Sequence, residues 1–287
     1  MSSILRTFFG EYNRPIAEAP HRPEPLSWRD SELTASWLGH ATVLINFFGF
    51  TILTDPTFFP RVGIRIGPLT VGPKRYVRCA LQPRELPFID LVLLSHAHMD
   101  HMDLRSLRKV RKAGFFVTAS QTADVFRWER RKNVRELAWG ETCEIPGRTG
   151  TAKIRAYKLR HWGARVRWDD HRTYNAYTIE RNGIQICFAG DTAWTSATEL
   201  GSTGQNALIL SPIGAYDPWV RSHCNPEEAV QMANEARARY VMPIHHQTFR
   251  LSREPMDEPI RRFEGALARE PERIALNAVG QTFQLAG

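Results

Sequence analysis

The sequence predicts an α/β fold in which two mixed β-sheets pack face to face and helices cover the outside, a four-layer αββα sandwich. Three observations lead to this fold class. Short runs rich in β-branched and aromatic residues follow one another after residue 33 and indicate an antiparallel meander. Strand and helix patterns then alternate along the chain. A second series of strands and helices fills the remainder, as expected of a second sheet with its own helices.

The elements of the first sheet follow from local patterns. Its first three strands are expected at residues 34–38, 42–48 and 51–54. Residues 90–95 form a continuous apolar run, as expected of a strand that is buried on both faces. Asp103 then caps a helix that extends to about residue 112. This half ends with a strand at residues 115–118 and a helix from Ser120 or Thr122 towards Arg130.

The second half of the chain repeats the same alternation. Four strands are expected at residues 154–159, 174–180, 184–189 and 207–211. An Asn-Gly turn at residues 182 and 183 joins two of them as a hairpin. Asn225 caps a helix with Pro226 in its first turn, and this helix extends to about residue 238. The remaining elements are a strand at residues 240–244, a helix at 257–268 and a strand at 282–285.

The domain organisation is expected to be simple. Residues 1–30 contain Pro15, Pro20, Pro23 and Pro25 and lack periodicity, which indicates an extended N-terminal arm. Residues 31–287 then form one catalytic domain. The arm also carries an apolar cluster that can pack on the domain, pair with another subunit or contact lipid: Ile4, Leu5, Phe8 and Phe9.

Composition limits the classes of partner and the location. A formal charge of +8 favours anionic partners, and peripheral membrane contact is compatible with it. Because arginines are scattered and do not form a basic tail, a small anionic substrate, which can be lipid-like, is favoured over stable binding of nucleic acid. The four cysteines form no C-x-x-C pair, so a disulfide framework is not expected and a cytoplasmic location fits best. No run of eighteen apolar residues indicates a membrane span.

A dense group of metal-ligand side chains follows the predicted strand at residues 90–95. His96, His98, Asp100 and His101 lie within six positions. Residues two apart face the same side of an extended chain, so His96 and His98 can converge on one metal ion. Asp100 and His101 lie where the chain turns into the next helix, and they can address a second ion. Packing alone does not explain such density.

One cluster cannot complete two coordination shells, because a catalytic zinc site needs about three protein ligands and an open position. The chain offers three further candidates at the ends of predicted strands, where a rigid sheet presents residues to a site. They are His161, Asp191 and His245.

Other side chains have two interpretations each. His40 can orient a ligand carboxylate or cap the turn at Gly39, and His223 can contact substrate, move a proton or lie on the surface. His246 competes with His245 as a ligand. Three cations can hold a phosphate or be solvated charges: Lys74, Arg75 and Arg221. Five aromatic residues can line an apolar pocket or belong to the core: Trp162, Trp194, Tyr216, Trp219 and Phe249.

The combined motif resembles that of the metallo-β-lactamase superfamily, which has H-x-H-x-D-H, a downstream His, an Asp in a Gly-Asp turn and a final His. Within it, the chain is similar to the N-acyl-phosphatidylethanolamine-hydrolysing phospholipase D group and to ascorbate-6-phosphate lactonase-like relatives, from about Trp37 to the C-terminus. The segments that carry the likeness are Trp37-Leu38-Gly39-His40-Ala41-Thr42, Leu53-Thr54-Asp55-Pro56, Gly72-Pro73-Lys74-Arg75, His161-Trp162, Phe188-Ala189-Gly190-Asp191-Thr192, Pro212-Ile213-Gly214-Ala215-Tyr216, Asn225-Pro226-Glu227-Glu228-Ala229 and Ile244-His245-His246-Gln247-Thr248-Phe249. The phospholipase pattern has Trp-Gly where this chain has His246-Gln247.

The resemblance implies a division of the ligands between two metal ions. It implies His96, His98 and His161 on one ion, Asp100, His101 and His245 on the other, and Asp191 as the bridge. Family position thus favours His245 over His246. Nitrogen and oxygen ligands suit Zn²⁺, two ions per chain, and tolerate Mn²⁺ or Fe²⁺.

The expected function is that of a metal-dependent hydrolase. A hydroxide that bridges the two ions attacks the substrate, Asp100 helps to orient this nucleophile, and His223 is the second candidate catalytic residue. The resemblance and the positive charge favour a phosphodiester of the phospholipase D type. The alternatives are a lactonase that acts on a phosphorylated sugar lactone and, from another class, a protein that binds or processes nucleic acid.

Overall fold

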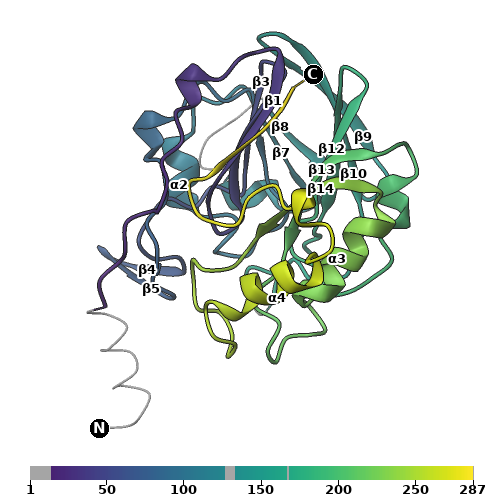
Figure 1. Ribbon diagram of the computed structural model, residues 1–287. Helices are drawn as coiled ribbons and strands as arrows, with labels where there is room; N and C mark the ends of the chain where they lie inside the picture. The colour runs from purple at the N-terminus through teal and green to yellow at the C-terminus, as the bar shows by residue number, and fades with distance from the viewer. Residues whose placement is uncertain (1–13, 127–132, 167, 287) are drawn as a thin grey trace, which may run out of the picture.

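The computed structural model describes residues 14–126, 133–166 and 168–286, and these form two mixed β-sheets that lie face to face (Figure 1). The first sheet has the strand order β15-β1-β2-β3-β6-β7-β8 and the second the order β14-β13-β12-β11-β10-β9. The strands of the first sheet are β1 (Glu32–Gly39), β2 (Thr42–Phe47), β3 (Phe50–Thr54), β6 (Leu91–Leu93), β7 (Phe115–Ala119), β8 (Val134–Leu137) and β15 (Thr282–Ala286). Those of the second are β9 (Thr142–Gly147), β10 (Gly150–Tyr157), β11 (Ala176–Arg181), β12 (Ile184–Phe188), β13 (Asn206–Pro212) and β14 (Ala238–Ile244). Strands β4 (Ile64–Ile66) and β5 (Leu69–Val71) form a separate hairpin.

Each sheet combines antiparallel and parallel pairs, which confirms the predicted fold class. In the first sheet β1, β2 and β3 form the predicted antiparallel meander, β15 adds an antiparallel strand beside β1, and β3, β6, β7 and β8 are parallel neighbours. In the second sheet β9 to β12 are antiparallel, whereas β12, β13 and β14 are parallel. The carboxyl ends of parallel strands meet at one edge of a sheet, and this geometry gathers the site residues.

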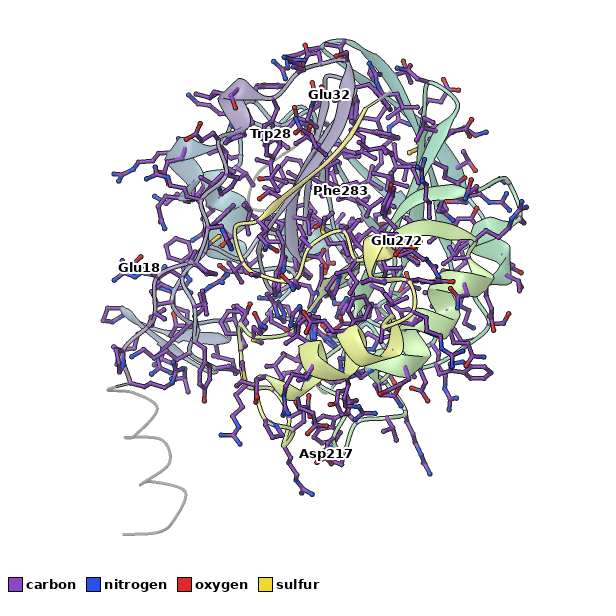
Figure 2. All side chains as sticks on the ribbon, viewed as in Figure 1. Glu18, Trp28, Glu32, Asp217, Glu272 and Phe283 are labelled. Carbon is purple, nitrogen blue, oxygen red and sulfur yellow. The ribbon has the colours of Figure 1, made fainter. Side chains whose placement is uncertain are left out.

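The apolar core has two parts. The larger part lies between the sheets and combines residues such as Trp37 of β1 with Tyr177 of β11 and Leu208 of β13. The second lies between the outer face of the second sheet and two helices, where Ile209 packs with Ala229 and Phe263. Figure 2 shows side chains filling the space between the sheets. The helices therefore hold the second sheet from outside while its inner face packs on the first.

Three α-helices lie in the described residues: α2 (Leu104–Lys109), α3 (Pro226–Glu235) and α4 (Glu258–Ala266). The starts of α2 and α3 agree with the predicted caps, because Asp103 accepts a hydrogen bond from the Ser106 amide and Asn225 forms a capping box with Glu228. Their ends come earlier than expected. The described part of the chain also contains five 3₁₀-helices: η1 (Pro25–Ser27), η2 (Pro83–Glu85), η3 (Ala123–Phe126), η4 (Thr198–Gly201) and η5 (Pro271–Arg273).

One predicted helix differs from the structure, and several short strands were not predicted. The helix expected from Ser120 or Thr122 is a 3₁₀-helix over Ala123–Phe126, and its predicted continuation to Arg130 lies in residues 127–132, outside the described part. The sequence analysis also missed β4, β5, β8 and β9. Much of these short strands is exposed, so they lack the apolar patterns that mark a buried strand.

The described part of the N-terminal arm runs along the loop after β5. Ala17 donates to Tyr76 O and accepts from the Arg78 amide, and Arg14 donates to the carbonyls of Lys74 and Arg75. The cluster of Ile4, Leu5, Phe8 and Phe9 lies outside the described residues. All four cysteines are free thiols. Among the described helices, none has the length and apolar character needed to cross a bilayer.

Candidate metal centre

The ends of several strands deliver histidine and aspartate side chains to one place. The segment that contains His96 and His101 follows β6, while Asp191 follows β12 and His245 follows β14. His161 comes four residues after the end of β10. All seven residues predicted as metal ligands lie together, in two adjoining groups.

The first donor group consists of His96, His98, His161 and Asp191. His98 Nδ1 lies 2.7 Å from His96 Nε2 and 3.4 Å from His161 Nε2. Asp191 Oδ2 is 4.0 Å from His96 Nε2 and 3.8 Å from His161 Nε2. Three nitrogens and one carboxylate oxygen thus lie within 4.8 Å of one another.

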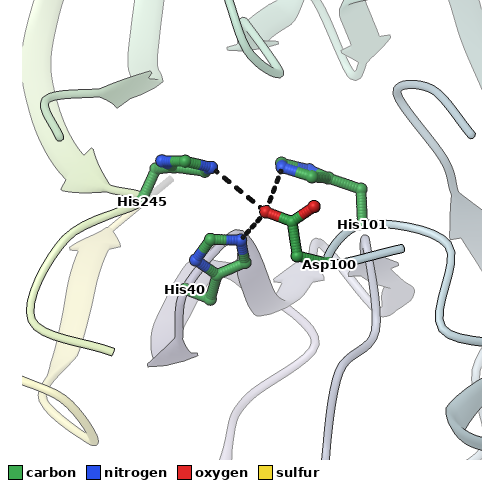
Figure 3. Close-up of side chains that lie close together, drawn as sticks. All are labelled: His40, Asp100, His101 and His245. Carbon is green, nitrogen blue, oxygen red and sulfur yellow. Dashed lines mark hydrogen bonds and ion pairs between the residues drawn. The ribbon is translucent and has the colours of Figure 1, made fainter. Parts of the chain in front are cut away.

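The second donor group consists of His40, Asp100, His101 and His245 (Figure 3). Asp100 Oδ2 lies 3.0 Å from His40 Nε2, 3.6 Å from His101 Nε2 and 3.7 Å from His245 Nε2. Figure 3 shows the three imidazole rings directed at this one carboxylate oxygen. The group is therefore arranged around Asp100.

Asp191 connects the two groups. Besides its place in the first group, its Oδ2 atom lies 3.0 Å from His101 Nε2 and 3.1 Å from His245 Nε2. One carboxylate oxygen thus contacts nitrogen donors of both groups. This is the position that a bridging ligand needs.

The electrostatics of the centre follow from its burial. Burial lowers the pKa of His98 to about 4 and that of His161 to about 3, so both rings are neutral, as metal ligands must be. Burial alone would raise the pKa of Asp191, but the charges of His101 and His245 hold it well below its usual range. Burial alone would lower the pKa of His245, but the carboxylates of Asp191 and Asp100 raise it to about 9. Buried carboxylates that stay ionised attract positive charge into the centre.

The donor set fits divalent metal ions. Nitrogens that bind a tetrahedral zinc ion at 2.0–2.1 Å lie about 3.3 Å apart; the distance is 3.4 Å between His98 Nδ1 and His161 Nε2 and 2.7 Å between His98 Nδ1 and His96 Nε2. Among the described residues, His101 Nε2 and His245 Nε2, which face Asp191, are buried without a hydrogen-bond partner, which is costly without a further ligand. The donors are nitrogen and oxygen atoms only, which suits Zn²⁺, Mn²⁺ or Fe²⁺.

One functional residue was missed by the sequence analysis. Asp55, directly after β3, is fully buried, and its Oδ2 atom lies 2.6 Å from His101 Nδ1. Its Oδ1 atom accepts a hydrogen bond of 2.8 Å from the Ser95 amide. A carboxylate on the far nitrogen of a ligand histidine fixes its tautomer and orientation. The signal in the sequence is an aspartate at the exit of a strand that precedes the motif strand.

Replacing this carboxylate is expected to weaken the centre without destroying it. In Asp55→Asn the volume is kept but the negative charge on His101 Nδ1 is lost, so we expect about a 10–100-fold loss of metal affinity or activity. Metal titration and steady-state kinetics measure the two effects. Thr51→Ser, near the other end of β3, serves as a control, and an Asp55→Asn variant with unchanged metal affinity and activity would contradict this role.

The structure decides between the interpretations of the neighbouring histidines. His40 is buried and contacts Asp100, as the orienting interpretation requires. His223 is largely buried at the margin of the centre, with Nδ1 3.9 Å from Asp191 Oδ2, so the surface interpretation is wrong. His246 stacks on Trp37 with ring centroids 4.4 Å apart, whereas His245 joins the second donor group.

Two of the three cations considered for phosphate binding have structural partners. Lys74 donates to Arg14 O, which ties the N-terminal arm to the domain. Arg75 is fully buried and donates to Phe59 O and to the carbonyl of Thr57, so its assignment to a phosphate is not supported. Arg221 remains exposed.

The five aromatic candidates divide into two kinds. Tyr216 is buried and donates to Glu258, and Phe249 is buried beneath the guanidinium of Arg75, so both belong to the packed interior. The three tryptophans are exposed: Trp162 by 52%, Trp194 by 41% and Trp219 by 55%. Trp162 packs edge-on against His98 at 4.5 Å, which places one exposed aromatic surface directly beside the donors.

A sandwich of two mixed sheets that gathers histidine and aspartate donors at its strand ends defines a class of metalloenzymes, those with the metallo-β-lactamase fold. Comparisons with known proteins agree with this class. The model of the beta-lactamase superfamily domain matches residues 51–246. The chain therefore belongs to this superfamily, and it is an enzyme, a metal-dependent hydrolase.

Individual relatives show how far the likeness extends. The chain is 31% identical over 284 residues to an uncharacterized protein of Mycobacterium tuberculosis, covering 93% of this chain and 74% of that one. It is 30% identical over 236 residues to N-acyl-phosphatidylethanolamine-hydrolyzing phospholipase D 1 of Caenorhabditis elegans, covering 77% of this chain and 65% of the relative. The match thus spans less than two thirds of the latter protein. Among solved structures, an isothiocyanate hydrolase from Delia radicum gut bacteria shares the fold with a TM-score of 0.70 at 18% identity, covering 88% of this chain and 100% of that one.

Proposed function

We propose that this enzyme hydrolyses a phosphodiester of the phospholipase D type at a centre of two zinc ions. The observation that carries the proposal is the pair of donor groups joined by Asp191, combined with the likeness to the nematode phospholipase D. A net charge of +8 supports an anionic substrate, because it raises the local concentration of anions.

The proposed division of the donors is the one that the family resemblance implies, and the two adjoining donor groups support it. His96, His98 and His161 would hold one ion and Asp100, His101 and His245 the other, with Asp191 as the shared ligand. Each set supplies about three protein ligands, as a catalytic zinc site does. Mn²⁺ or Fe²⁺ in place of Zn²⁺ would use the same donors.

The chain's own residues then orient and protonate the reacting groups. Bound ions lower the pKa of a water molecule and stabilise negative charge on the substrate. Asp100 would orient this water, because its carboxylate is 17% exposed while His40 contacts it from the buried side. His223, 14% exposed, has a ring nitrogen without a hydrogen-bond partner in the described chain, and it is placed to contact the substrate or to move a proton.

A substrate comparison tests the proposal. Metal-replete enzyme is assayed on phospholipid diesters, simple aryl phosphodiesters, plain lactones and phosphorylated sugar lactones, with the Asp191→Ala variant as the control for activity at this site. We expect the highest kcat/KM on a diester. Lactone turnover at least about a hundredfold faster, equivalent to about 2.7 kcal/mol, would reject the diesterase assignment and leave the metal centre standing.

Nucleic-acid processing is the alternative from another class. The basic net charge alone favours it, and the proposed small substrate predicts only weak binding of RNA or DNA. A binding titration at increasing salt separates the two. Tight binding with a steep salt dependence would favour the nucleic-acid function.

A further inference from the structure

The β4–β5 hairpin presents an apolar face to solvent. Its register pairs Ile64 with Val71 and Ile66 with Leu69, so these four side chains lie on one face, whereas Arg65 and Thr70 lie on the other. The exposed fractions are 57% for Ile64, 63% for Ile66, 56% for Leu69 and 42% for Val71. A face made only of large apolar side chains, all exposed, indicates an interaction surface.

The hairpin is held away from the two sheets. Figure 1 shows it at the lower left, apart from both. At the base of the hairpin its two backbone segments approach each other closely. A Cβ atom on Gly63 would lie 2.2 Å from Val71 O, and a Cβ atom on Gly72 would lie 2.1 Å from Val62 O. Only glycine fits at these two positions, whose φ angles are +130° and +150°. The sequence thus forms a projecting hairpin although two strands alone gain little stability in water.

A strongly basic pocket lies between this hairpin and helix α2. Its volume is about 660 Å³. Of the described residues that line it, six are cationic and the other two are Phe59 and Pro68. The cations are Arg65, Arg105, Arg108, Lys109, Arg111 and Lys112. Arg65 and Pro68 belong to the hairpin, so the pocket borders the hairpin on its Arg65 side while the apolar side chains lie on its other side. The projecting hairpin with the cations beside it is here called the hairpin surface.

We propose that the hairpin surface docks on an anionic lipid bilayer. A bilayer of this kind offers a negatively charged interface above an apolar interior, which matches cations beside apolar side chains. A second copy of the chain seated on the apolar face would supply no anionic counterpart for the six cations on the other side of the hairpin. A nucleic acid would pair with the cations but would leave the four apolar side chains exposed to water.

Docking does not depend on the proposed phosphodiesterase function, since it requires no turnover. If both hold, the surface brings the metal centre to lipid substrates at the interface. Binding is therefore measured without a substrate, and its failure would leave the result of the substrate comparison unaffected.

Co-sedimentation with vesicles tests the proposal. The full chain is mixed with vesicles of phosphatidylcholine alone and with vesicles of equal parts phosphatidylcholine and phosphatidylglycerol, at low and at physiological salt. We expect binding only to the second, weakened by salt. The triple variant Lys109→Glu, Arg111→Glu, Lys112→Glu and, separately, the double variant Ile66→Ser, Leu69→Ser are each expected to bind at least about tenfold more weakly. All five side chains are exposed, so the fold is expected to remain.

A matched control separates the hairpin surface from net charge. The variant Arg239→Glu, Arg261→Glu, Arg269→Glu changes the charge by the same amount at exposed positions near β14 and α4, and it is expected to keep its binding. An equal loss in this control would overturn the proposal, because binding would then follow total charge. Full vesicle binding by both hairpin-surface variants would also overturn the proposal. The same holds if the double variant Ile4→Ser, Phe8→Ser loses binding while the double variant Ile66→Ser, Leu69→Ser keeps it. A dimer that the double variant converts to a monomer, without vesicle binding, would assign the surface to a second copy.

Discussion

Replacing Asp191 by alanine is expected to lower kcat/KM by about a thousandfold and to reduce the bound metal below two equivalents per chain. Asp191 Oδ2 lies within 4.0 Å of nitrogens from His96, His101, His161 and His245, so its loss removes a donor from both groups. A thousandfold loss corresponds to about 4 kcal/mol of transition-state stabilisation, a reasonable figure for a metal-held charge. Elemental analysis and steady-state kinetics on the same preparation measure both effects.

The control for this experiment is His223→Ala. Its side chain lies at the margin of the centre, 3.9 Å from Asp191, and is not among the proposed ligands. We therefore expect a smaller loss of activity and about two metal equivalents retained. Equal, mild effects of the two substitutions would show that Asp191 is not the bridge.

Removal of the metal is expected to abolish hydrolysis and to lower Tm by on the order of 10 °C. Without an ion, the buried carboxylate of Asp191 and the partly buried carboxylate of Asp100 lie among several imidazoles with no metal charge to balance them. An ion that binds only the folded state adds about 4 kcal/mol when its concentration is a thousand times its Kd. Differential scanning calorimetry before and after chelation measures the shift.

Restoring single metals identifies the ion. We expect Zn²⁺ to restore both activity and Tm. Mn²⁺ and Fe²⁺ are tested under the same conditions. The chelated Asp191→Ala variant serves as the reference, since its Tm should change less on adding metal. Metal-free enzyme with undiminished hydrolytic activity would end the metal-centre hypothesis.

Much of the fold could be predicted because its interior strands carry strong patterns. The strand expected at residues 184–189 is β12 (Ile184–Phe188), and that expected at 207–211 lies within β13 (Asn206–Pro212). The Asn182-Gly183 turn adopts positive φ angles of 53° and 74°, as its sequence predicts. Strand β9 was missed because Pro146 and Gly147 lie within it and only Ile145 of its residues is buried.

The candidate site was predicted less evenly. His96, His98, Asp100 and His101 are adjacent in sequence, so their density reveals them without knowledge of the fold. The partnership of His40 with Asp100 spans 60 positions and depends on how β1 and β2 lie against the motif segment. Such a contact follows from sheet topology and leaves no local pattern.

Three residues of the centre carry a backbone conformation that ordinary side chains avoid. The φ angles are +57° at His40, +30° at Asp55 and +63° at His245. Left-handed backbone costs roughly 1–2 kcal/mol per non-glycine residue, and glycine would relieve it. Glycine would also remove a donor or its supporting carboxylate, so stability and activity are opposed at these positions. Stabilising changes that preserve hydrolysis must therefore come from elsewhere in the fold, away from the turns that place the donors.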